Sequence, residues 1–136
     1  MPYKFEQLDV WKLSLDYIDL VYKVAEQLPR HEDYNLKSQI TRAATSIALN
    51  IAEGSQGQSD AEQARFLGMA IRSLVETVAC QKIIQRRAYL QDEGLLQKAY
   101  DDSQLLAKKL QNFRKSLAKS QYQVGEDVSV YEDDIL

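Results

Sequence analysis

Apolar residues recur every three or four positions through four long segments of this chain, and only short polar breaks separate those segments. Such spacing is typical of amphipathic helices that turn one face toward a shared core. The expected helices span about residues 6–28, 35–53, 59–88 and 92–120. Because long helices joined by short turns run antiparallel, we predict an all-α, up-down four-helix bundle over residues 1–120. We expect residues 121–136 to form a short, acidic, flexible tail.

The breaks between these segments carry helix start and stop signals. Pro29 ends the first helix, since proline cannot continue it. Gly54 is expected to end the second helix in a left-handed conformation. Ser59 and Glu62 have the spacing of a capping box, and Asp92 is the expected cap of the fourth helix. The helix boundaries can therefore be placed from local signals alone.

Composition restricts the class of protein further. A chain of 136 residues is most simply one domain. It contains a single cysteine, Cys80, so no intramolecular disulfide can form, and we expect a buried, inert thiol. It shows no signal-peptide pattern and no apolar run near the ~20 residues that span a bilayer. We therefore expect a cytoplasmic protein with no membrane partner.

The first helix carries two apolar stripes, about 130° apart around its axis. The first stripe, a candidate subunit interface, comprises Leu8, Trp11, Leu15, Ile18, Tyr22 and Ala25. The second comprises Val10, Leu13, Tyr17, Val21, Val24 and Leu28. One apolar face is enough for a helix of an isolated bundle. Either one stripe faces a neighbouring subunit, or the helix lies deep within its own bundle.

The second helix is two-sided over residues 42–54. Its apolar side comprises Ile40, Ala44, Ile47 and Ile51. The nearly opposite side carries a polar stripe of Arg42, Ser46, Asn50 and Glu53. Spaced polar side chains of this kind can simply form a solvated helix face. Alternatively, the stripe is buried against another chain or a ligand, and the residues alone leave both possibilities open.

Four segments together resemble a known family of small bacterial proteins. They are residues 5–12 (Phe-Glu-Gln-Leu-Asp-Val-Trp-Lys), residues 28–40 with Leu28-Pro29, Tyr34, Leu36 and Gln39-Ile40, residues 42–54, and residues 66–76 with Phe66-Leu67 and Ser73-Leu74-Val75-Glu76. The resemblance covers roughly residues 4–90. The family is encoded in intervening sequences of large-subunit (23S) ribosomal RNA genes. Arg72 departs from its pattern, which has a small residue, usually glycine, at that position.

The resemblance implies a four-helix bundle that forms closed rings, typically pentamers. It also adds Ser73 and Glu76 to the polar stripe as family-motif residues. The family is related to the accessory protein of diversity-generating retroelements, which partners a reverse transcriptase and binds its RNA. A reverse transcriptase is thus a possible partner by resemblance, next to RNA or DNA and to further copies of this chain.

Charge is unevenly distributed. Between residues 82 and 119, nine basic residues accompany four acidic ones, a local net charge of +5. The nine are Lys82, Arg86, Arg87, Lys98, Lys108, Lys109, Arg114, Lys115 and Lys119. Such an excess is an electrostatic footprint for nucleic acid, although basic residues on exposed helices are common and these need not share a face. A further hypothesis is that the acidic tail folds back onto this basic half and competes with phosphate.

Catalytic patterns are absent from the sequence. His31 is the only histidine, so neither a zinc-protease motif nor Glu-x-x-His di-iron pairs can be completed. Asn50 with Glu53, and Ser73 with Glu76, could each form a polar site, but no nucleophile or set of metal ligands accompanies them. We therefore expect no enzyme, no catalytic residue, no metal and no cofactor.

Three functional hypotheses remain at this point. The first is an RNA-associated, ring-forming binding or scaffolding protein. The second is an accessory subunit of a reverse transcriptase. The third is a purely structural ring, in which Arg42, Asn50 and Glu53 pair within or between chains.

Overall fold

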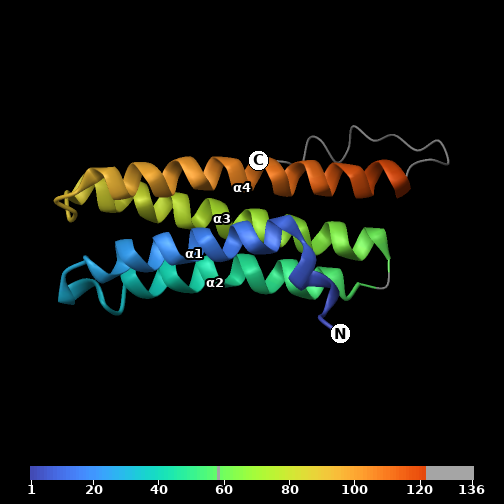
Figure 1. Cartoon of the computed structure of the whole chain (residues 1–136). Coiled ribbons are helices and arrows are strands. Elements are labelled where there is room, and N and C mark those ends of the chain that lie inside the picture. Colours follow the sequence, from blue (N-terminus) through green and yellow to red (C-terminus); the bar gives the residue numbers. More distant parts are fainter. Residues whose placement is uncertain (58, 122–136) are drawn as a thin grey trace.

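A computed structural model describes residues 1–57 and 59–121 (Figure 1). Its elements are η1 (Lys4–Gln7), α1 (Asp9–Glu26), η2 (Arg30–Glu32), α2 (Leu36–Ser55), α3 (Asp60–Arg87) and α4 (Glu93–Gln121), where η marks a 3₁₀ turn. Each helix packs antiparallel against the next, and α4 also packs against α1, which closes the bundle. The predicted fold class, an up-down four-helix bundle, is confirmed. The predicted tail lies almost wholly outside the described residues.

Two helix boundaries differ from the prediction. The first segment is not one helix from residue 6, because Leu8 is extended and separates η1 from α1. The second helix does not stop at Gly54 but continues in a right-handed conformation to Ser55. A Cβ added at Gly54 would lie only 2.8 Å from Cβ of Phe66 on α3. Gly54 is therefore required for the close approach of α2 and α3, and the expected left-handed stop is wrong.

The predicted caps of the two long helices are present. Ser59 Oγ accepts a hydrogen bond from the Glu62 backbone N–H at 3.1 Å. Asp92 Oδ1 accepts from the Gly94 backbone N–H at 2.9 Å, at the start of α4. Among the non-glycine residues that the structure describes, Ala88 at the end of α3 is left-handed, with φ 55°. These contacts satisfy backbone groups that a helix end leaves unpaired.

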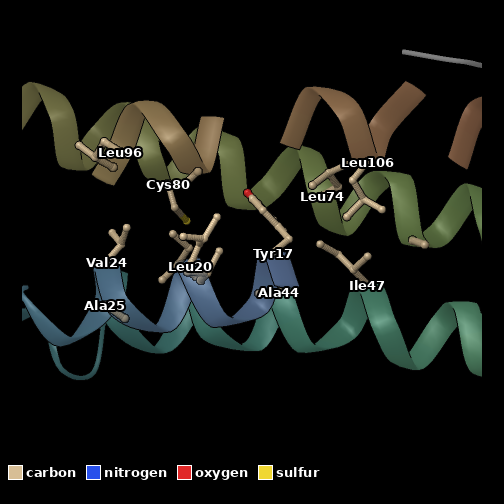
Figure 2. Close-up of a cluster of buried hydrophobic side chains, with 14 of the residues drawn as sticks. Tyr17, Leu20, Val24, Ala25, Ala44, Ile47, Leu74, Cys80, Leu96 and Leu106 are labelled. Atoms are coloured by element: carbon tan, nitrogen blue, oxygen red, sulfur yellow. The ribbon is translucent and has the colours of Figure 1, made fainter. Parts of the chain in front are cut away.

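The core confirms which side of each helix faces inward. Tyr17, Val21 and Val24 of the second α1 stripe are fully buried, and Figure 2 shows Tyr17 and Val24 pointing from α1 toward α3 and α4. On α2 the predicted apolar side is likewise fully buried: Ile40, Ala44, Ile47 and Ile51. Cys80 is also buried in this cluster, as expected, and burial raises the pKa of its thiol.

A polar network crosses the core between α1 and α3. The Tyr17 hydroxyl lies 2.7 Å from Thr77 Oγ1 and accepts a hydrogen bond from Gln81 Nε2 at 2.6 Å. Thr77 donates its own proton to the Leu74 carbonyl oxygen, so Tyr17 must donate to Thr77. Burial raises the pKa of Tyr17 to about 12, against the lowering effect of these hydrogen bonds. Every proton of the Tyr17–Thr77 pair is thereby assigned.

The first stripe of α1 is partly exposed in the single chain, although its last member, Ala25, is buried in the core. Leu15 is 41% exposed and Tyr22 is 45% exposed, while Leu8, Trp11 and Ile18 are half-buried against the core. On the neighbouring α2, Leu49 is 58% exposed. The helix is therefore not enclosed by its own bundle, and an apolar α1–α2 face of Leu15, Tyr22 and Leu49 remains uncovered in the chain.

Candidate functional site

The predicted basic residues extend along α3 and α4 rather than forming one cluster. The exposed ones are Lys82, Arg86, Arg87, Lys98, Lys108, Lys109 and Lys115. Arg114 is half-buried, and the side chain of Lys119 lies outside the described part of the chain. Arg86 and Arg87 end α3, whereas Arg114 lies near the opposite end of the bundle. The structure therefore brings only some of these residues to a common groove.

Two cationic contacts join α3 to α4, and we call the strip of surface between them the α3–α4 groove. At one end, Lys82 Nζ lies 4.2 Å from the centroid of the Tyr100 ring. At the other end, the Arg114 guanidinium covers Gly68, where an added Cβ would lie 3.3 Å from Arg114 Cζ. The two contacts are 14 residues apart on each helix, which is about 21 Å along the axis. Because residues seven apart share a face of packed helices, both cations lie on one line.

A cavity accompanies each contact. The smaller one, about 80 Å³, lies at the Lys82 end and is lined by Gln81, Lys82, Gln85, Glu93, Leu96, Gln97 and Tyr100. The larger one, about 480 Å³, lies at the Arg114 end and is lined by Arg65, Gly68, Met69, Ile71, Arg72 and Arg114. Only the larger cavity gathers guanidinium groups from both helices. We call Arg65, Arg72 and Arg114 the arginine cluster.

The three arginines of the cluster differ in how they are held. Arg65 donates to the Glu62 carboxylate at 2.7 Å, and its Cζ lies 4.6 Å from the Phe66 ring centroid. This hydrogen bond lowers the pKa of Glu62. Arg72 is exposed and forms no ion pair with the described residues. Arg114 Nε is buried without a hydrogen-bond acceptor in the described part of the chain. Two of the three guanidinium groups therefore keep unused donors.

Sequence reasoning found Arg114 but missed the rest of this site. Arg65 and Arg72 lie outside the region chosen for its positive charge, and Gly68 is an unremarked glycine within a predicted helix. A signal was present, because Arg65 and Arg72 are seven residues apart and flank Gly68 on one face. Tyr100 was likewise missed, since only the antiparallel register of α3 and α4 places it under Lys82.

The family-motif polar stripe is partly assembled between α2 and α3. Ser73 Oγ donates to Ser46 Oγ at 3.0 Å, and Asn50 Nδ2 donates to Ser46 Oγ at 3.1 Å. The charged members are exposed, and none of them has an ion-pair partner among the described residues; they are Arg42, Glu53 and Glu76. Arg42 and Glu53 therefore form no ion pair within the described chain, and pairing between chains is what remains of the third hypothesis for them.

A second polar cluster joins the two turns at one end of the bundle. The buried Glu32 carboxylate accepts from the Tyr89 hydroxyl at 2.7 Å and from Asn35 Nδ2 at 3.0 Å. The bond from Tyr89 is the main reason that the pKa of Glu32 is lowered. The same bond raises the pKa of Tyr89. His31 Nε2 lies 3.2 Å from the Tyr89 hydroxyl, and Arg87 lines a cavity with Glu32. Arg87 thus belongs to this cluster and not to the α3–α4 groove.

Two further tests concern metals and membranes. Among residues 1–57 and 59–121, no group of three or more His, Cys, Asp or Glu side chains is placed to hold a metal ion. No helix in the described part of the chain combines the length and apolarity required to cross a membrane.

A comparison with known protein families identifies the family to which the chain belongs. Residues 6–112 match the profile of the 23S rRNA-intervening sequence protein family. This chain belongs to that family. The match extends beyond residues 4–90, where the family resemblance is visible in the sequence, and includes most of α4.

A solved structure supports the same assignment. A protein with unknown function from the S23 ribosomal protein family of Bacteroides thetaiotaomicron shares 27% sequence identity with this intervening-sequence protein and superposes with a TM-score of 0.71. The match covers 78% of this chain and 98% of the other. No curated protein matches the chain. Membership of the family is thus established, whereas a link to diversity-generating retroelements stays a prediction.

Proposed function

We propose that this intervening-sequence protein is a non-enzymatic, self-associating scaffold that binds RNA along its α3–α4 groove. The observation that carries the proposal is the alignment of Lys82 and Arg114 on one line of that groove. Cations that lie along one line suit a polynucleotide backbone, whose phosphates supply most of the binding free energy. The Lys82 ammonium lies over the ring of Tyr100, so an unpaired base can stack on that face once Lys82 has moved to a phosphate.

The outer face of α4 adds to this positive surface. Lys108 and Lys115 are exposed and seven residues apart, so they share one face of the helix. Lys98 and Lys109 are exposed nearby on the same helix. Self-association would repeat this surface in each copy and would multiply the number of phosphates contacted. RNA binding in this proposal therefore depends on many weak contacts rather than on one pocket.

Self-association is proposed to use the apolar α1–α2 face of Leu15, Tyr22 and Leu49. These three side chains are between 41% and 58% exposed in the single chain. Exposed apolar side chains that lie together can form part of a protein–protein contact. A repeated head-to-tail contact would close into a ring, and a pentamer is the size that the family resemblance implies. A cytoplasmic location fits this proposal.

A purely structural ring is the second candidate. It is favoured by the polar stripe, since Arg42, Glu53 and Glu76 form no ion pairs with the described residues. In this case the three side chains would pair across subunits, and Arg42→Ala or Glu53→Ala would lower the oligomer mass while RNA binding was absent from the start. A role as the accessory subunit of a reverse transcriptase would instead require that enzyme in the same complex.

The salt dependence of RNA affinity tests the proposal. The affinity of the full chain for a single-stranded RNA oligonucleotide is measured by fluorescence anisotropy over a range of salt concentrations. Affinity falls as salt rises, and each lost phosphate contact makes the slope of log affinity against log salt less steep by about 0.7. The double variant Lys82→Gln/Arg114→Gln should therefore give a slope that is less steep by about 1.4. Lys23→Gln, an exposed charge on α1, is the control and should leave it unchanged. Equal slopes for all three proteins would refute the groove as the RNA site.

A further inference from the structure

The arginine cluster differs from the other cavities along the basic surface in gathering guanidinium groups from both α3 and α4. Arg65, Gly68 and Arg72 come from α3, Arg114 comes from α4, and about 480 Å³ of space lies between them. This volume lies within the range of small-ligand pockets. Its lining also includes the buried Ile71 and Met69, which is 37% exposed and accepts a hydrogen bond from Arg65 Nη1 at its sulfur. Cations beside the exposed part of Met69 suit a ligand with a charged group attached to a less polar body.

The Arg114 guanidinium packs against α3 at Gly68, where there is no side chain to exclude it. An added Cβ would lie 3.3 Å from Cζ, 3.4 Å from Nη2 and 3.5 Å from Nε of Arg114. The guanidinium plane therefore lies against the α3 backbone, and its buried Nε has no acceptor among the described residues. A glycine inside a helix is less favourable than alanine, and here its missing side chain leaves room for the guanidinium.

The charge of the cavity distinguishes between kinds of anion. The cluster contributes three positive charges, and Glu62, bound to Arg65, contributes one negative charge, so the local net charge is +2. An internal phosphodiester carries a single negative charge, whereas a terminal phosphate monoester carries about −1.5 to −2 at pH 7. Guanidinium groups match such a phosphate with paired hydrogen bonds.

We propose that the arginine cluster binds a terminal phosphate monoester, with the attached nucleoside over Met69. This inference rests on the proposed RNA binding, and it assigns the cavity to the phosphorylated end of the strand while the remaining groove contacts internal phosphates. The same chemistry is present in a free mononucleotide, so the two sources must be separated by experiment.

The experiment compares two RNA oligonucleotides of one sequence, one with a 5′-phosphate and one with a 5′-hydroxyl group, each labelled at the 3′ end. Anisotropy with the full chain should show about tenfold tighter binding of the phosphorylated strand, the effect of one charge-assisted contact. Arg114→Gln should abolish this preference. Gly68→Ala should weaken it, although it removes no charge, because its Cβ would lie 3.3 Å from Arg114 Cζ and would shift the guanidinium by a few tenths of an ångström. Arg30→Gln, an exposed arginine in the α1–α2 turn, should retain the preference.

The possible outcomes separate the two proposals. Equal affinity for both strands would overturn the monoester site and leave RNA binding along the groove intact. Binding of neither strand would overturn RNA binding, and adenosine monophosphate then becomes the probe. Binding of that nucleotide by the wild-type chain and its loss in Arg114→Gln would support a monoester site for a free nucleotide. Binding of neither RNA nor nucleotide would overturn both proposals. Circular dichroism of each variant establishes that it is folded.

Discussion

The hydroxyl of Tyr17 donates a hydrogen bond to Thr77 Oγ1 across the core, over 2.7 Å. It joins α1 to α3, which occupy diagonal corners of the bundle and share no close backbone contact. A buried polar pair of this kind is satisfied in one alignment of the two helices only, since a shift of either helix would leave polar groups unpaired. The Tyr17–Thr77 pair therefore favours one lengthwise alignment of α1 against α3.

We expect Tyr17→Phe to destabilise the fold by about 1–3 kcal/mol, because Gln81 Nε2 would be left buried without its acceptor. The measurement is urea unfolding followed by circular dichroism. Tyr22→Phe serves as the control, since that ring is 45% exposed and its loss of a hydroxyl should not matter. Equal unfolding midpoints for the two variants would show that the network adds nothing to stability.

Gly54→Ala is expected to destabilise the protein by about 1–3 kcal/mol, the usual cost of overpacking, although alanine favours helix. The new Cβ would lie 2.8 Å from Phe66 Cβ, and neither backbone can yield easily. Gly68→Ala is the matched comparison, because its Cβ meets only the flexible end of Arg114. Thermal unfolding should therefore give a lower midpoint temperature for Gly54→Ala than for Gly68→Ala. A stabilised Gly54→Ala protein would contradict the close approach of α2 and α3.

The Glu32–Tyr89 hydrogen bond predicts a specific pH dependence of stability. The pKa of Glu32 is lowered in the folded chain, so its contribution is present above the unfolded pKa and is lost as pH falls through the folded pKa. Tyr89→Phe should therefore destabilise the protein at about pH 7 and have a smaller effect at an acidic pH below the lowered pKa of Glu32. Tyr34→Phe is the control, because Tyr34 is fully exposed. A Tyr89→Phe effect that is the same at both pH values would exclude the carboxylate as the partner.

If copies of the chain associate through the apolar α1–α2 face, a charge introduced on that face should lower the native mass of the oligomer. Tyr22→Asp should shift the oligomer to smaller species, because a buried charge at an apolar contact is costly. Tyr34→Asp adds the same charge at a site away from this face and should leave the mass unchanged. Native mass spectrometry or light scattering measures both. A wild-type monomer would already show that the exposed stripe of α1 is not a subunit contact.

Local patterns predicted the fold because they are governed by short-range chemistry. The spacing of Ile40, Ile47 and Ile51 is enough to show which side of α2 is buried, and the caps at Ser59 and Asp92 are recognised from neighbouring residues. The error at Gly54 has a different origin. Its conformation depends on Phe66, a residue of the next helix, so no signal inside residues 42–54 could reveal it.

The candidate site was harder to predict for the same reason. Positive charge between residues 82 and 119 is visible in the sequence, but the partners of each cation are set by how α3 lies against α4. Arg114 was included for its charge alone, and its seat on Gly68 depends on that antiparallel register. Arg87 was included for the same reason, and it lies with Glu32 at the end of the bundle instead.

The line that joins Lys82 to Arg114 also restricts how the α3–α4 hairpin can change in length. Inserting one residue into α3 between positions 68 and 82 would turn one end of the helix by about 100° relative to the other. One cation would then leave the groove while the other stayed. Only paired insertions of about seven residues in both helices preserve the line, and each would add space for a further contact. Relatives that keep this groove should therefore differ from this chain in steps of a heptad.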